Sequence, residues 1–100
     1  MIKMDTETHP IRILEPFEVT FKKPNALEKA GMEKVIHKFC YKYLDMDLLY
    51  SNIIHEHTHI RLKNPIVYQE MIISEFKVSD EGNVVGIGEK EGRKYYIQIW

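Results

Sequence analysis

The chain has 100 residues, 44% of them hydrophobic and 29% charged, and its 14 Lys and Arg against 15 Asp and Glu give a net charge of −1. This size fits one small globular domain, and the near-neutral charge excludes the global basic field with which a protein recruits nucleic acid or anionic lipid. One cysteine cannot form an internal disulfide and no apolar run approaches the length of a membrane span, so we expect a cytoplasmic protein without a membrane segment.

The N-terminal quarter of the chain predicts a tail followed by a strand. Residues 1–10 are polar, so we expect a flexible tail there and a single domain over residues 11–100. From Ile11 to Lys23 apolar and polar residues alternate, which is typical of a half-buried strand. Pro16 interrupts this alternation and, because it lacks an N–H, fits an edge or a bulge better than a central strand.

The most regular pattern in the sequence predicts one long helix from Ala26 to Leu44. Asn25 is a favourable N-cap, and Glu28 follows at the spacing of a capping box. Cys40 lies beside the apolar stripe of this helix, so we expect a small buried side chain there rather than a nucleophile. The stripe that should face a sheet, with a period of 3.6 residues, consists of Met32, Val35, Ile36, Phe39 and Tyr43.

The second half of the chain is rich in strand-forming residues. Leu48–Lys63 fits either a helix or a strand, and Asn64-Pro65 is expected to end it. Turn-forming residues divide the remainder into an antiparallel meander with predicted strands at Ile66–Ser79, Val84–Lys90 and Lys94–Trp100. We therefore predict an α+β fold with one long helix packed on an antiparallel sheet of four or five strands, in the order β-α-β-β-β-β.

One short motif carries candidate chemistry. Residues 55–59 read His-Glu-His-Thr-His and match H-E-x-x-H, the zinc signature of metallopeptidases. On a helix, His55 and His59 would lie one turn apart and could share a zinc ion, while Glu56 would take the proton from a zinc-bound water. A downstream carboxylate such as Glu75 would have to supply the third ligand. This interpretation gives a zinc-dependent metallopeptidase-like protein with Glu56 as its catalytic residue.

The strand interpretation, which the β-branched residues around the motif favour, removes that mechanism. In a strand, His55, His57 and His59 share one face and Glu56 points to the other, so no base stands beside the metal. Alternate histidines on one strand can still ligate zinc, and His55 and His59 share a face in either conformation. We therefore predict at most weak zinc binding and no peptidase activity. In the simplest alternative, the three histidines lie on a solvated strand face.

The C-terminal strand carries the remaining candidate binding residues. Tyr96 and Trp100 alternate with expected core residues, and Arg93 adds a positive charge. A final strand also leaves an edge for pairing with another chain. Our leading hypothesis is a small non-enzymatic binding or regulatory module. It would act through a sheet face or edge on a protein partner, or on a second copy as a homo-oligomer. The alternatives are the metallopeptidase and a single-stranded nucleic-acid binder, against which the net charge counts, using Tyr96, Trp100, Arg93 and Lys94.

Overall fold

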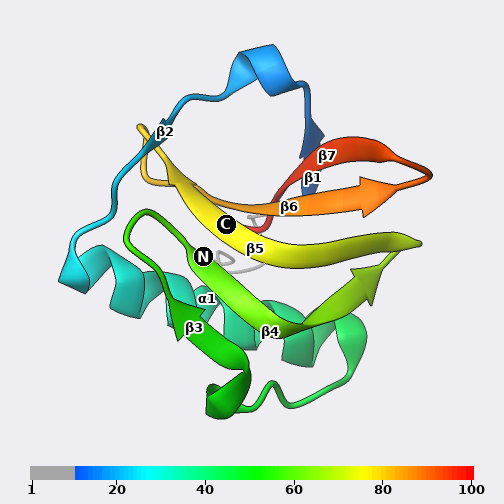
Figure 1. Ribbon diagram of the computed structural model, residues 1–100, viewed down its shortest axis with the longest axis horizontal. Helices are drawn as coiled ribbons and strands as arrows, with labels where there is room; N and C mark the ends of the chain where they lie inside the picture. Colours follow the sequence, from blue (N-terminus) through cyan, green and yellow to red (C-terminus); the bar gives the residue numbers. More distant parts are fainter. Residues whose placement is uncertain (1–10) are drawn as a thin grey trace, which may run out of the picture.

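A computed structural model describes residues 11–100, so the predicted N-terminal tail lies outside the described part of the chain. Residues 11–100 form one α-helix and an antiparallel sheet of seven strands, which confirms the predicted α+β class (Figure 1). The expected count of four or five strands and the expected order β-α-β-β-β-β are wrong, because two short strands precede α1 and a third, β3, follows it, and short strands escape periodicity arguments. In chain order the elements are β1 (Arg12–Leu14), η2 (Pro16–Glu18), β2 (Phe21–Lys22), α1 (Ala26–Leu44), η3 (Tyr50–Asn52), β3 (Ile53–His55), β4 (Ile60–Tyr68), β5 (Met71–Ser79), β6 (Val84–Lys90) and β7 (Arg93–Gln98).

The helix α1 begins and ends at the predicted residues. Asn25 Oδ1 accepts the Glu28 backbone N–H at 2.8 Å, and Glu28 Oε1 accepts the Asn25 N–H at 3.0 Å, which completes the capping box. The ammonium of Lys22 lies 2.6 Å from the Glu28 carboxylate, and this hydrogen bond lowers the pKa of Glu28. Asp45 ends the helix in the left-handed region, with a φ of 52°, and its N–H donates to the Cys40 carbonyl.

The helix packs on one face of the sheet through most of the predicted stripe. Met32, Ile36 and Phe39 are buried, and Val35 is partly buried against the same core. The expectation that Tyr43 belongs to the core is wrong, since the residue is 40% exposed. It lies near the C-terminal end of the helix, where its ring contacts Phe39 at the rim of the core.

Cys40, three residues before Tyr43 on the same helix, belongs to the core. Its side chain is fully buried, and this burial raises the pKa of the thiol to about 11. A thiol that stays protonated is a poor nucleophile. The prediction of a small buried side chain is therefore confirmed.

The strand order in the sheet is β1-β7-β6-β5-β4-β3, and β2 pairs with β5. The expected single strand Ile66–Ser79 is wrong, because the chain turns back at Gln69-Glu70 between β4 and β5. Both turn residues have positive φ values, 49° and 69°, although neither is Gly or Asn. Since the usual residues of a tight hairpin turn are absent, sequence patterns do not reveal this turn.

Asn64-Pro65 does not end a strand, contrary to expectation. Both residues lie inside β4, where the register with β5 shifts between Arg61 and Ile66. A strand tolerates proline at such an irregularity because no ladder hydrogen bond is lost there. The Asn52 side chain binds both backbone groups of Asn64, with distances of 2.5 and 3.0 Å.

The N-terminal segment crosses the face of the sheet that α1 leaves open (Figure 1). As predicted, Pro16 interrupts the strand, which divides into β1 and β2 around the short helix η2. Because β1 pairs with β7 and β2 pairs with β5, the segment passes over β6, which lies between those two strands. We name residues 12–22 the crossover.

Two apolar clusters result, one on each face of the sheet. The larger lies between α1 and the sheet, and Gly86 and Gly88 of β6 face it without side chains of their own. The smaller lies beneath the crossover, with Val85 and Ile87 of the same strand at its centre. In β6, glycines therefore point toward the helix, where the neighbouring core side chains leave little room for a Cβ. The aliphatic residues that alternate with them point toward the crossover and fill the smaller cluster.

Candidate functional site

The histidine motif forms a hairpin loop. The strand β3 ends at His55, β4 begins opposite it at Ile60, and residues 56–59 connect them. The backbone N–H of Glu56 donates to the carbonyl of His59 at 2.9 Å and closes the loop. Both conformations considered for Leu48–Lys63, one helix or one continuous strand, are therefore wrong. The isoleucines on either side favour strands, and the polar residues between them favour a turn.

This hairpin separates the histidines that the sequence was expected to bring together. His55 pairs with Glu33 of α1, whereas His59 Nε2 lies 3.3 Å from the Glu75 carboxylate on β5. His57 is exposed in the loop between them. The prediction that His55 and His59 share a face is therefore wrong, because each end of the loop faces a different element.

The same geometry bears on the predicted zinc chemistry. The Glu56 carboxylate accepts a hydrogen bond from Arg61 Nε at 2.9 Å, so it is engaged within its own hairpin. The helical arrangement needed for the peptidase mechanism is absent from this segment. Within residues 11–100, no group of three or more His, Cys, Asp or Glu side chains is placed to hold a metal ion. Zinc binding by His55, His57 and His59 stays a prediction.

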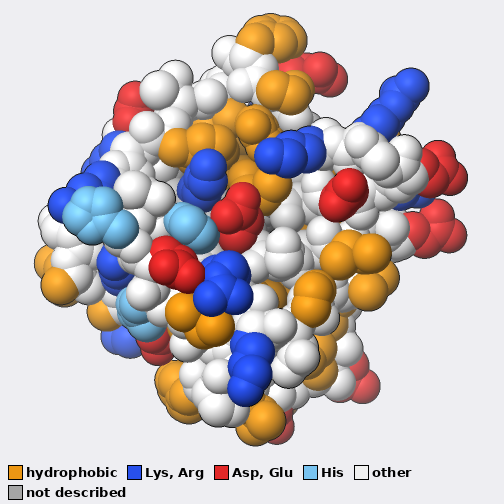
Figure 2. All heavy atoms as spheres, viewed as in Figure 1, with side chains coloured by type: hydrophobic (Ala, Val, Ile, Leu, Met, Phe, Trp, Pro, Cys, Tyr) orange, Lys and Arg blue, Asp and Glu red, His pale blue; other side chains and the backbone are white. Residues whose placement is uncertain are grey.

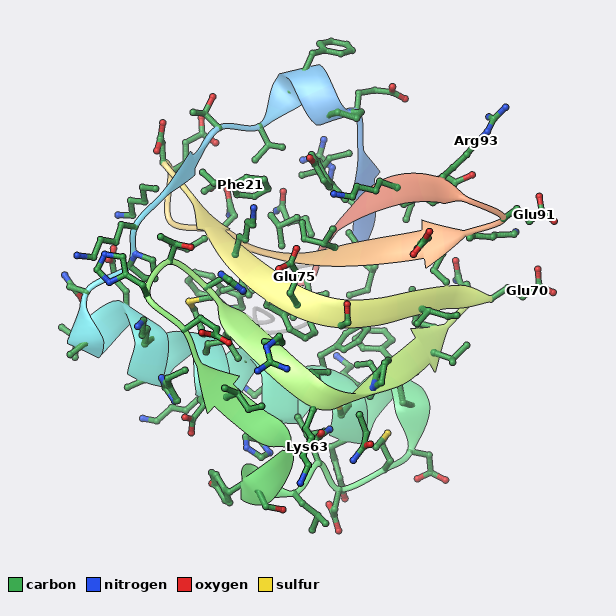
Figure 3. The ribbon with its side chains drawn as sticks, in the orientation of Figure 1. Phe21, Lys63, Glu70, Glu75, Glu91 and Arg93 are labelled. Atoms are coloured by element: carbon green, nitrogen blue, oxygen red, sulfur yellow. The ribbon has the colours of Figure 1, made fainter. Side chains whose placement is uncertain are left out.

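One side of the loop joins a polar cluster on the sheet face opposite α1. His59 pairs with Glu75, Glu56 pairs with Arg61, and Arg61 lies directly opposite Glu75 in the register of β4 and β5. Figure 3 shows Glu75 at the centre of this face, and Figure 2 shows basic, acidic and histidine side chains mixed around it. Partly exposed ion pairs of this kind contribute little to stability. With the histidine neutral, Glu56, Glu75 and Arg61 give the cluster a formal charge of only −1, and each carboxylate already has a partner within the cluster.

The other side of the loop forms one wall of a groove, which we name the α1 groove. It has a volume of about 830 Å³ and lies between α1 on one side and η3 with β3 on the other. Lys29 Nζ donates to the Glu56 carbonyl at 2.5 Å, and Glu33 pairs with His55, so two side chains one helical turn apart fasten the walls together. The lining residues are Ala26, Lys29, Ala30, Glu33, Lys34, His37, Lys38, Tyr50 and His55.

An aromatic contact forms one end of the α1 groove. The rings of His37 and Tyr50 lie 4.4 Å apart between centroids, at an angle of 46°. His37 Nε2 is buried and has no hydrogen-bond partner among the described residues. Tyr50 is 74% exposed, so most of its ring faces solvent. The groove therefore offers an aromatic surface that residues 11–100 leave uncovered.

Sequence patterns only partly indicate the α1 groove. The side chains at Lys29, Glu33 and His37 form a polar i, i+4 series along the helix, which is a readable signal of one exposed helix face. Nothing local indicates that Tyr50 and His55 lie against this series. Their position depends on the turn of the chain after α1 and on the hairpin at residues 56–59.

The predicted C-terminal binding residues do not form one surface. The edge of β7 is covered by β1, so the expectation of an open edge there is wrong. Tyr96 is partly buried in the small cluster, where its ring meets Phe21 edge-on at 5.4 Å. Arg93 begins β7 and Trp100 follows its other end, which separates them by the length of the strand. A binding role for these three residues stays a prediction.

No protein-family model matches this chain, and no curated protein or solved structure is detectably similar to it. No helix in the described part of the chain combines the length and apolarity needed to cross a membrane.

Proposed function

We propose that this chain is a small non-enzymatic binding module and that a segment of a protein partner docks in the α1 groove. The observation that carries the proposal is the exposed ring of Tyr50 in the same groove as the small side chains of Ala26 and Ala30. Tyrosine is enriched among the residues that dominate protein-binding energies. Small side chains along a helix leave room for the partner to approach.

The form of the α1 groove favours a protein segment over a small molecule. Small ligands bind where about 70–90% of their surface is buried. In this groove Ala26, Ala30 and Tyr50 are all exposed to solvent, so a small molecule would stay largely hydrated. A chain segment compensates by contacting the groove along its length.

The walls of the α1 groove support the proposal because contacts within the chain join them before any partner binds. Contacts from Lys29 and Glu33 tie the helix to the hairpin, and His37 holds the ring of Tyr50. Preorganised walls reduce the ordering cost of association. The proposal moves the docking surface from the sheet edge, which β1 covers, to the helix.

The proposal places the protein in the cytoplasm, because its cysteine is an unpaired buried thiol. The occupant is a different protein rather than a second copy. Analytical ultracentrifugation would overturn that choice if the wild type dimerised and Tyr50→Ala made it monomeric.

The docking test starts from a random peptide library selected on the wild-type chain. Bound peptides are located by amide chemical shifts in the ¹⁵N-labelled protein, and we expect the shifts to concentrate on α1, η3 and β3. Tyr50→Ala should weaken the selected peptides at least about tenfold, which corresponds to about 1.4 kcal/mol.

The matched control is Phe17→Ala, which removes another exposed aromatic ring, 84% exposed, from the crossover. This variant should bind the selected peptides within about twofold of the wild type, as expected for a residue outside the interface. Shifts concentrated on the sheet face, or equal effects of the two substitutions, would overturn the proposal.

A further inference from the structure

We infer that the segment docking in the α1 groove is acidic and extended, an inference that rests on the proposed function. Three lysines and one glutamate line the groove, so its formal charge is +2 with the histidines neutral. The whole chain carries −1. The groove is thus a basic surface on a slightly acidic protein, and such local fields select partners of opposite charge.

Two of the three lysines, Lys34 and Lys38, supply the positive charge of the α1 groove that stays unpaired within the described residues. Lys34 and Lys38 are both exposed, and neither makes a hydrogen bond or ion pair within residues 11–100. Lys29, by contrast, donates to the Glu56 carbonyl, and the only carboxylate of the groove, Glu33, pairs with His55. The negative charge is therefore engaged inside the protein, while two positive charges face solvent.

The spacing of these lysines fits an extended partner. Residues four apart on a helix are separated by about 6 Å along its axis. Alternate residues on a strand are separated by about 6.6 Å and point to the same side. Acidic side chains at alternate positions of an extended segment can therefore face Lys34 and Lys38 together, while the intervening side chains point away from the two lysines.

The charge of the whole chain favours an acidic peptide over a nucleic acid. A nucleic acid is a long polyanion, and outside the α1 groove the chain has no excess of positive charge to attract it, since its net charge is −1. A short acidic segment needs only the local positive charge of the groove.

The probes are fluorescein-labelled octapeptides that alternate Glu–Leu, Gln–Leu or Lys–Leu, together with a labelled oligothymidylate of eight nucleotides. Fluorescence anisotropy measures each Kd at low and high salt. We expect Glu–Leu to bind at least about tenfold tighter than Gln–Leu and to weaken about tenfold at high salt, because exposed charges are screened. Lys–Leu should bind most weakly.

Variants of the chain assign the effect to the lysines. K34E/K38E should weaken the Glu–Leu peptide at least about tenfold and reverse the preference in favour of Lys–Leu. The control K63E/K94E makes the same change of charge at two exposed lysines outside the groove, and should act within about twofold. Circular dichroism checks that both double variants keep the fold.

The outcomes separate this inference from the proposed function. Peptides that bind the α1 groove by chemical shift but show no charge preference would overturn the acidic segment and leave the docking groove intact. Equal effects of the two double variants would also overturn the inference. Tighter binding of the oligothymidylate than of any peptide would show that the lysines serve a nucleic acid instead.

Discussion

Replacing Gly86 by Ala should destabilise the protein, whereas the same substitution at Gly31 should stabilise it. A Cβ at Gly86 would lie 3.0 Å from Phe76 Cε2 and 3.3 Å from Ile73 Cγ2, inside the core under α1. Both neighbours are fully buried, so neither has space into which to move. A Cβ at Gly31, on the exposed side of the helix, would meet nothing within 4 Å.

The magnitudes follow from these distances. Overpacking a dense core costs about 1–3 kcal/mol. Restricting the unfolded chain by replacing Gly with Ala offsets about 0.4–1 kcal/mol of that cost. Gly86→Ala should therefore lose about 1–2 kcal/mol of unfolding free energy, whereas Gly31→Ala should gain about 1 kcal/mol from helix propensity.

Urea denaturation followed by circular dichroism measures both effects on one scale. One kcal/mol corresponds to a shift in Tm of about 4–8 °C for a domain of this size, so thermal melts resolve the two variants in opposite directions. A Gly86→Ala variant as stable as the wild type would refute the tight packing of β6 against Phe76. A destabilised Gly31→Ala variant would refute the exposed position of that residue.

Three further measurements test the fold. Phe39→Ala should cost about 3–5 kcal/mol in urea melts, because the ring is buried between α1 and the sheet, and a loss below about 1 kcal/mol would mean that another helix face is buried. Gln69→Asn combined with Glu70→Gly should raise stability by about 1 kcal/mol, since both positions have positive φ and the new residues favour it; an unchanged denaturation midpoint would contradict this. Cys40 should resist a disulfide reagent at pH 8 in the native protein and react after unfolding, because burial raises the pKa of its thiol to about 11, and rapid native reaction would show an open site.

The helix was predictable because its signals are local. The Asn25 cap, the spacing to Glu28 and the apolar period all lie within α1 or directly before it. The turn at Gln69-Glu70 was not predictable, because its conformation needs positive φ and neither Gln nor Glu is a residue type that favours positive φ. Tertiary pairing of β4 with β5 imposes that turn on an unfavourable sequence.

The hairpin that carries the histidines was not predictable for a different reason. Alternation extends over only three residues before the loop, which is too short to distinguish a strand end from the middle of a strand. The H-E-x-x-H match also depends on residue order alone, whereas its chemistry depends on a helix. His55 meets Glu33 from 22 positions away, and no local pattern indicates that contact. The α1 groove shares this origin, because Tyr50 reaches it from beyond the end of the helix.

Because of the crossover, the face of the sheet under α1 can form before the face under the crossover. Hairpins join β4 to β5, β5 to β6 and β6 to β7, so the central sheet and the face under α1 assemble from nearby segments. The pairing of Arg12 with Gln98, in contrast, joins positions separated by most of the described chain. Because distant contacts close slowly, Val85 and Ile87 stay exposed until β1 reaches β7. A late intermediate of this protein would therefore present an apolar strip on β6, and conditions that slow the closing of the crossover would favour aggregation through that strip.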